Sequence, residues 1–108
     1  MPFKDISPQH YAAMKDDPAQ AHVLIDVRDP WEYQTAHIEG SQLMPLGQLY
    51  EWGATLDKTT HYVVMCHHGG RSAMACQVLA SLGFQQLSNL EGGIDGWAMS
   101  VDTSEPRY

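Results

Sequence analysis

Two short apolar segments constrain the fold of this chain more than any other feature. Residues 23–27 read VLIDV and residues 62–66 read YVVMC, so each is a nearly continuous apolar run of strand length. A strand with one wet face alternates apolar and polar residues, whereas a run like these is typical of a strand covered on both faces in a parallel sheet. The sequence therefore predicts a parallel sheet with a layer of structure on each side.

Helical segments separate these runs and two weaker strand candidates. Ser7-Pro8 and Asp29-Pro30 resemble helix starts, and Gly83 resembles a helix end. The expected strands cover residues 23–27, 41–44, 62–66 and 86–90, and the expected helices cover about 8–16, 30–35, 46–52, 71–82 and 93–97. Strands and helices alternating at this spacing predict right-handed βαβ crossovers. We therefore expect an α/β fold with a small parallel sheet of about four to five strands and helices on both faces.

The size and charge of the chain narrow its function classes. Its 108 residues, 44% of them hydrophobic, suit a single domain over residues 1–108, and no repeat or linker divides them. The net charge of −7 argues against binding to nucleic acid or an anionic membrane surface. No apolar stretch has membrane-spanning length, and the first residues lack the pattern of a signal peptide. Two cysteines outside any paired zinc spacing fit a reducing compartment, so we expect a cytoplasmic protein. The small size of the chain and the lack of an evident apolar stripe favour a monomer.

The segment CHHGGRS, residues 66–72, joins the second apolar run to an Ala-rich helix. Four residues separate Cys66 from Arg71, so the chain must reverse within a very short loop, and Gly69 and Gly70 permit the positive φ that this requires. Successive N–H groups in such a turn can converge on an anion, helped by the positive end of the following helix. Because ligands of parallel sheets bind at the carboxyl ends of strands, Cys66 is placed to act as a nucleophile.

Such a nucleophile needs electrostatic help. An ordinary thiol, with a pKa of about 8.5, is only about 3% ionised at pH 7. A helix terminus contributes about 0.3–1 kcal/mol, which is too little, whereas a cation about 4 Å away can supply roughly 4 kcal/mol before desolvation costs. Arg71, or a protonated His67 or His68, is therefore expected to complete the activation.

Simpler roles are open to the same residues. Cys66 could be a small core residue at a strand end, and Cys76 fits a packed core thiol better than a resolving thiol that attacks an oxidised Cys66. A metal site of Cys66, His67 and His68 is disfavoured because adjacent side chains in a tight loop are expected to diverge, and no distant ligand cluster is evident. We therefore expect no metal and no cofactor.

An ion pair is also expected near the first apolar run. Arg28 and Glu32 lie four residues apart around a strand-to-helix turn. That spacing favours a structural pair between the two side chains over acid–base chemistry.

Three ordered motifs resemble the rhodanese (thiosulfate sulfurtransferase) family. Residues 66–72, preceded by Val63-Val64-Met65, resemble its active-site loop. Residues 24–46, LIDVRDPWEYQTAHIEGSQLMPL, resemble its amino-terminal signature, and residues 90–97, LEGGIDGW, resemble its carboxyl-terminal one. The resemblance covers nearly the whole chain.

This resemblance implies sulfur transfer through a persulfide on Cys66. The Cys66 thiolate would attack the outer sulfur of thiosulfate or a similar donor, and cyanide or a thiol would then remove that sulfur. Thioredoxin or another sulfur carrier is a further candidate acceptor. Arg71 would attract the anionic donor, and the backbone of residues 67–72 would hold the charged sulfur. The implied substrate-binding residues are His67, His68, Gly69, Gly70, Arg71 and Ser72.

Two alternative functions stay open on the sequence. A cysteine-dependent phosphatase or arsenate reductase of related fold carries five residues between cysteine and arginine, and this chain carries four. A non-catalytic interaction or sulfur-relay domain is the second alternative, although inactive relatives commonly lack the cysteine that is present here as Cys66.

Overall fold

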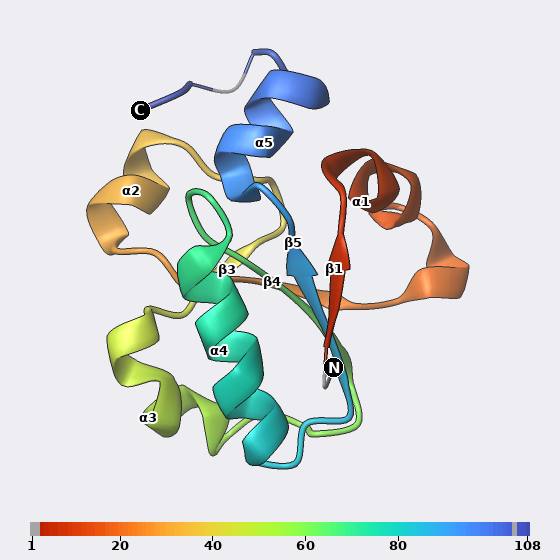
Figure 1. Ribbon diagram of the computed structural model, residues 1–108, viewed down its shortest axis with the longest axis vertical. Coiled ribbons are helices and arrows are strands. Elements are labelled where there is room, and N and C mark those ends of the chain that lie inside the picture. The colour runs from red at the N-terminus through yellow and green to blue at the C-terminus, as the bar shows by residue number, and fades with distance from the viewer. Residues whose placement is uncertain (1–2, 105) are drawn as a thin grey trace.

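The computed structural model describes residues 3–104 and 106–108, and its centre is a five-stranded, fully parallel sheet (Figure 1). The strands are β1 (Lys4–Ile6), β2 (Val23–Asp26), β3 (Gln42–Leu43), β4 (His61–Met65) and β5 (Gln86–Leu90). Their order across the sheet is β1-β5-β4-β2-β3. The two apolar runs pair directly, with Leu24 opposite Val63 and Ile25 opposite Val64. The α/β class, the parallel sheet and the strand number expected from the sequence are confirmed.

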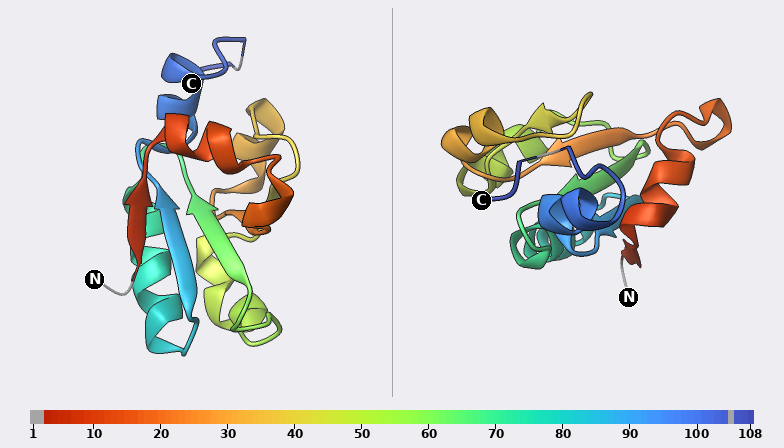
Figure 2. Two further views of the ribbon diagram at one scale, coloured as in Figure 1. Left: turned by 90° about the vertical axis from the view of Figure 1, so that its right-hand side faces the viewer. Right: turned by 90° about the horizontal axis from the view of Figure 1, so that it is seen from above.

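Helices cover both faces of this sheet, as the view from above shows (Figure 2). They are α1 (Pro8–Met14), α2 (Pro30–Thr35), α3 (Leu49–Gly53), α4 (Gly70–Ser81) and α5 (Gly93–Ser100), with short 3₁₀ turns at Pro18–Gln20 and Leu46–Gln48. Core residues of α3 and α4 pack on one face, and those of α1 and α5 pack on the other.

Strand β4 shows why both layers are needed. Tyr62 and Val64 belong to the core beneath α3 and α4, whereas Val63 and Met65 belong to the core beneath α1 and α5. Successive side chains of a strand point to opposite faces, so an uninterrupted apolar run fills two cores at once. Cys66 follows in the same alternation and lies with the core beneath α3 and α4.

The structure differs from the sequence expectations mainly in the edge strand β1 and in the bounds of two helices. The sequence did not predict β1, because only Ile6 of its three residues is buried and the segment carries no apolar run. The expected helix over 46–52 is split into a 3₁₀ turn and the short α3, and α5 continues three residues beyond Trp97. Within the described residues, we find no helix with both the length and the apolar character to cross a membrane.

Candidate active site

Cys66 lies directly after β4, at the carboxyl end of an interior strand flanked by β2 and β5. The loop after it rises above the sheet and leads into α4, as Figure 1 shows. The sulfhydryl is buried, with 1% of the residue exposed. This is the position where parallel α/β sheets bind ligands.

The loop curls back over the sulfur. Gly69 has φ +108°, a conformation that L residues with side chains rarely adopt, and its N–H donates a hydrogen bond to Cys66 Sγ at 3.0 Å. Gly70 does not share the positive φ and instead begins α4. The sequence assigned the positive φ of the turn to both glycines, whereas in the structure only Gly69 has it.

Ser72 approaches the same sulfur from the first turn of α4. Its Oγ lies 3.4 Å from Cys66 Sγ, and it also contacts the Gly69 carbonyl at 3.1 Å and Asn89 Oδ1. Asn89 is a buried residue of β5 and donates its Nδ2 to Asp5 at 3.0 Å. The sequence reasoning missed Asn89; a polar side chain near the end of an otherwise buried strand was the available signal.

The N-terminus of α5 fixes the other side of the loop. Ile94 N–H donates to the Cys66 carbonyl at 2.9 Å, and Asp95 N–H donates to the His67 carbonyl at 3.1 Å. Gly93, at φ +59°, passes so close that a Cβ there would lie 2.3 Å from the Cys66 carbonyl oxygen. The LEGGIDGW motif is therefore a docking element for the cysteine loop.

Arg71 is paired with a carboxylate that the sequence argument did not foresee. Its Nη1 and Nη2 each donate to a different Glu32 carboxylate oxygen, both at 2.8 Å. Glu32 also accepts from the Asp29 N–H and from the Tyr108 hydroxyl, each at 2.9 Å. The hydrogen bonds from Arg71 are the chief cause that lowers the pKa of Glu32 to about 2, against the effect of burial. An ionised carboxylate thus offsets the Arg71 charge, and the same pairing raises the Arg71 pKa.

The expected ion pair between Arg28 and Glu32 is wrong. Arg28 is fully buried, and its Nη2 lies 2.6 Å from Asp26 Oδ2 at the end of β2. It reaches Glu32 only through the backbone carbonyl at 3.4 Å. Helical i,i+4 spacing does not apply here, because Arg28 precedes α2 and its side chain fits under the Ala36 carbonyl instead.

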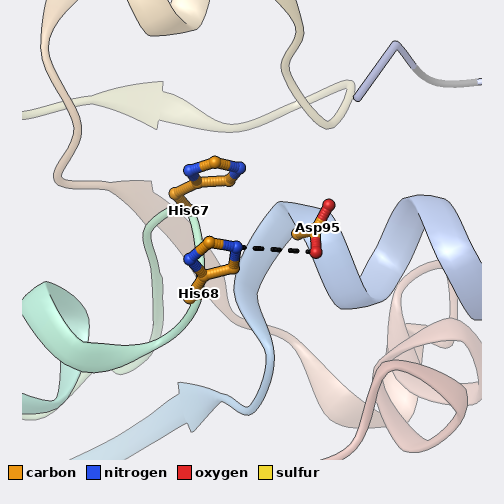
Figure 3. Close-up of side chains that lie close together, drawn as sticks. All are labelled: His67, His68 and Asp95. Carbon is orange, nitrogen blue, oxygen red and sulfur yellow. Dashed lines mark ion pairs between the residues drawn. The ribbon is translucent and has the colours of Figure 1, made fainter. Parts of the chain in front are cut away.

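The expectation that His67 and His68 diverge is also wrong. Their rings stack at 4.0 Å between centroids, and the Tyr108 ring covers the other face of His67 at 4.1 Å. His68 Nε2 lies 3.5 Å from Asp95 Oδ2, which Figure 3 shows beside the two rings. Burial, and then the neighbouring His68, lowers the pKa of His67. Tyr108 and Asp95 were missed because only the docking of distant segments brings them here.

Cys76 lies in the middle of α4 and is fully buried. Burial is the main cause that raises the pKa of this thiol to about 12, with smaller contributions from Asp5 and Cys66. Its environment is that of a packed core residue.

Comparison with known proteins identifies the family. A model of the Rhodanese-like domain matches residues 7–100. The chain is 35% identical over 95 residues to the thiosulfate sulfurtransferase GlpE of Pseudomonas fluorescens, covering 88% of this chain and 84% of that protein. It is 34% identical over 113 residues to the Rhodanese-like/PpiC domain-containing protein 12, chloroplastic, of Arabidopsis thaliana, covering 99% of this chain but only 38% of that protein.

A solved structure of a rhodanese-like domain protein has the same fold as this chain. The Rhodanese-like domain protein from Staphylococcus aureus superimposes with a TM-score of 0.82 at 23% identity, and the match covers 98% of this chain and 99% of that one. With its parallel sheet, its cysteine loop at the end of β4 and these matches, the chain belongs to the family of rhodanese-like domains.

Proposed function

We propose that this protein is a sulfurtransferase that moves a sulfane sulfur from thiosulfate, or a similar donor, to cyanide or a thiol through a persulfide on Cys66. The observation that carries the proposal is the hydrogen bond from the Gly69 N–H to Cys66 Sγ at the end of β4. The similarity to a thiosulfate sulfurtransferase over most of both chains supports the same activity.

The reaction has two displacements at sulfur. The Cys66 thiolate attacks the outer sulfur of thiosulfate, a new S–S bond forms, and the donor's S–S bond breaks with its electron pair leaving on sulfite. The acceptor then attacks the outer sulfur of the persulfide. Cyanide becomes thiocyanate, a thiolate becomes a persulfide, and the Cys66 thiolate is restored in either case.

Backbone amides are the main stabilising groups in this proposal. The Gly69 N–H already contacts Sγ, and the outer sulfur of a persulfide would extend into the turn formed by His67, His68 and Gly70. The Ser72 hydroxyl supplies a second donor 3.4 Å from Sγ. Because these donors belong to a short turn and a helix start, they need little rearrangement when charge moves between sulfur atoms.

Arg71 has a smaller role than the sequence argument gave it. Its charge is paired with Glu32, so the pair as a whole presents little net charge to an incoming anion. We infer that Arg71 chiefly fixes the start of α4 against the residues around α2. Its half-exposed guanidinium still offers a donor edge to an anionic substrate.

Phosphatase or arsenate reductase chemistry is less well supported. Four residues between Cys66 and Arg71 leave a small turn, and both Arg71 terminal nitrogens are committed to Glu32. A tetrahedral oxyanion needs a wider ring of donors and a free guanidinium. The presence of Cys66 at the end of β4, with the Gly69 N–H on its sulfur, favours a catalytic domain over a non-catalytic one.

The proposed persulfide also suggests which molecules accept the sulfur and in which compartment the protein works. A persulfide on a small acidic protein can be passed to a low-molecular-weight thiol, to thioredoxin or to another carrier protein. We infer a monomer that works in the reducing environment of the cytoplasm, where both free cysteines stay reduced.

Intact-mass measurement after incubation with thiosulfate tests the proposal. We expect one added sulfur atom on the wild-type protein, removed by cyanide with release of thiocyanate. Cys66→Ser should lose the adduct, whereas the matched control Cys76→Ser should keep it. Absence of an adduct with thiosulfate and with a persulfide donor would refute the sulfurtransferase proposal, and Cys66-dependent hydrolysis of an aryl phosphate would favour the phosphatase instead.

A further inference from the structure

Three side chains with metal-binding atoms converge beside the cysteine loop: His67, His68 and Asp95 (Figure 3). One ligand atom from each lies within 4.8 Å of the others. The two histidines come from the loop after β4 and the aspartate from the first turn of α5, where Asp95 N–H holds the His67 carbonyl. The backbone contact that docks α5 therefore also brings the three side chains together.

One atom of this cluster lacks a partner. Within the described residues, His67 Nε2 is buried and makes no hydrogen bond. Rings of His68 and Tyr108 stack on its two faces and hold the imidazole in place. A buried nitrogen without a partner costs about 1–3 kcal/mol, so such an atom in a folded protein is expected to meet a water molecule or an ion.

We propose that His67, His68 and Asp95 bind one divalent transition metal ion of the zinc type. Two imidazoles and one carboxylate are a ligand set that suits Zn²⁺, Co²⁺ or Ni²⁺, whereas Mg²⁺ and Ca²⁺ prefer oxygen ligands alone. Three protein ligands leave at least one coordination position open to solvent or to a small anion.

The distances fit this assignment with one modest movement. Metal–ligand bonds of about 2.0–2.2 Å in a tetrahedral site place neighbouring ligand atoms about 3.3 Å apart. His68 Nε2 and Asp95 Oδ2 are already 3.5 Å apart. Nearly parallel rings aim their nitrogens side by side, so one ring must turn to meet a shared ion. The His68 side chain is 69% exposed and can make that turn.

The surroundings orient the carboxylate. Arg107 Nε donates to Asp95 Oδ1 at 2.9 Å, and its Nη2 makes a longer contact of 3.4 Å with Oδ2, the oxygen that faces His68. Groups that hold a ligand by its second atom are a regular feature of protein metal sites. Cys66 is not part of the cluster, because its sulfur turns to the Gly69 N–H beneath the loop. The proposal therefore stands whether or not Cys66 transfers sulfur.

Titration of the tag-free full chain tests the site. We expect one Zn²⁺ per chain by calorimetry, and Co²⁺ bound at the same place should give the visible absorption bands of a nitrogen- and oxygen-ligated ion without a thiolate charge-transfer band. Binding should weaken by about tenfold or more in His68→Gln and in Asp95→Asn, two substitutions near the surface. Circular dichroism checks that each variant is folded.

Two controls make the result decisive. His10→Ala removes an exposed histidine far from the cluster in sequence and should leave binding unchanged. Cys66→Ser should also retain the ion, and its loss there would assign the metal to the thiol instead. Absence of saturable binding at millimolar Zn²⁺, or equal binding by wild type, His68→Gln and Asp95→Asn, would overturn the proposal.

Discussion

The two cysteines of this protein are buried almost equally, yet their surroundings are opposite. Cys66 is 1% exposed and Cys76 is 0% exposed. The Cys66 sulfur accepts a hydrogen bond from the Gly69 N–H and lies beside the Ser72 hydroxyl. Cys76 sits in mid-helix against the core, where its thiol pKa rises to about 12. Burial by itself makes a thiol inert, and we propose that the donors aimed at the Cys66 sulfur keep this thiol reactive.

Thiol labelling gives the largest expected contrast. The rise in the Cys76 pKa from 9.0 to about 12 cuts its thiolate fraction by about a thousandfold at neutral pH. In the folded protein, a small methanethiosulfonate reagent should therefore modify Cys66 first, and Cys76 at least about a thousandfold more slowly than in the denatured chain. Peptide mapping by mass spectrometry measures both rates. Equal labelling rates of the two cysteines in the folded protein would contradict the proposed difference in their reactivity.

A methyl group at Gly93 should disturb the loop around Cys66 and leave the surroundings of Cys76 unchanged. In Gly93→Ala the new Cβ would lie 2.3 Å from the Cys66 carbonyl oxygen, so the loop and α5 must separate. We expect a loss of about 2–3 kcal/mol in unfolding free energy and a fall of about tenfold or more in sulfur transfer. Denaturant titration and a thiosulfate–cyanide assay measure these effects.

Gly96→Ala is the matched control in the same helix. Its Cβ would meet neighbours at no less than 3.4 Å, and its backbone is helical. Near wild-type activity is expected there. Equal activity of Gly93→Ala and the control would mean that α5 does not shape the cysteine loop.

The pH dependence of stability tests the pairing of Arg71 with Glu32. With a pKa lowered to about 2, Glu32 stabilises the folded state fully above its ordinary pKa of 4.5, and this contribution is lost as the pH falls towards 2. We estimate it at roughly 2–3 kcal/mol for this nearly buried carboxylate. Glu32→Gln should therefore be less stable at pH 7, and its unfolding free energy should depend less on pH between 5 and 2. A constant gap between the two proteins across that range would contradict the assignment.

The smallest effect is expected at Ser72. Its Oγ carries one proton, which is shared among Cys66 Sγ, the Gly69 carbonyl and Asn89. Removing such a donor should cost about 1 kcal/mol, so Ser72→Ala should slow persulfide formation by about fivefold. Ser81→Ala, at the exposed end of the same helix, is the control and should not change the rate. A loss of a hundredfold would make the hydroxyl, rather than the Gly69 amide, the main donor.

The sequence predicted those features that local patterns encode. The apolar runs fixed β2 and β4 on a two-sided sheet, and the position of Cys66 at the end of β4 followed from them. Which charged groups pair could not be read in the same way. Arg71 meets Glu32 across 39 positions, and Tyr108 reaches Glu32 across 76. Such partners depend on how elements pack, and a residue spacing along one element carries no information about them.

The contact between α5 and the cysteine loop has a consequence for protein engineering. Each peptide unit of the loop has a donor end and an acceptor end, and α5 engages the outward-facing oxygens of Cys66 and His67. The heptapeptide 66–72 transplanted alone onto another sheet would lack these two hydrogen bonds from α5, and nothing would then hold the Gly69 amide towards the sulfur. A working graft must carry residues 90–97 as well, so the smallest portable unit of this chemistry is discontinuous in the chain.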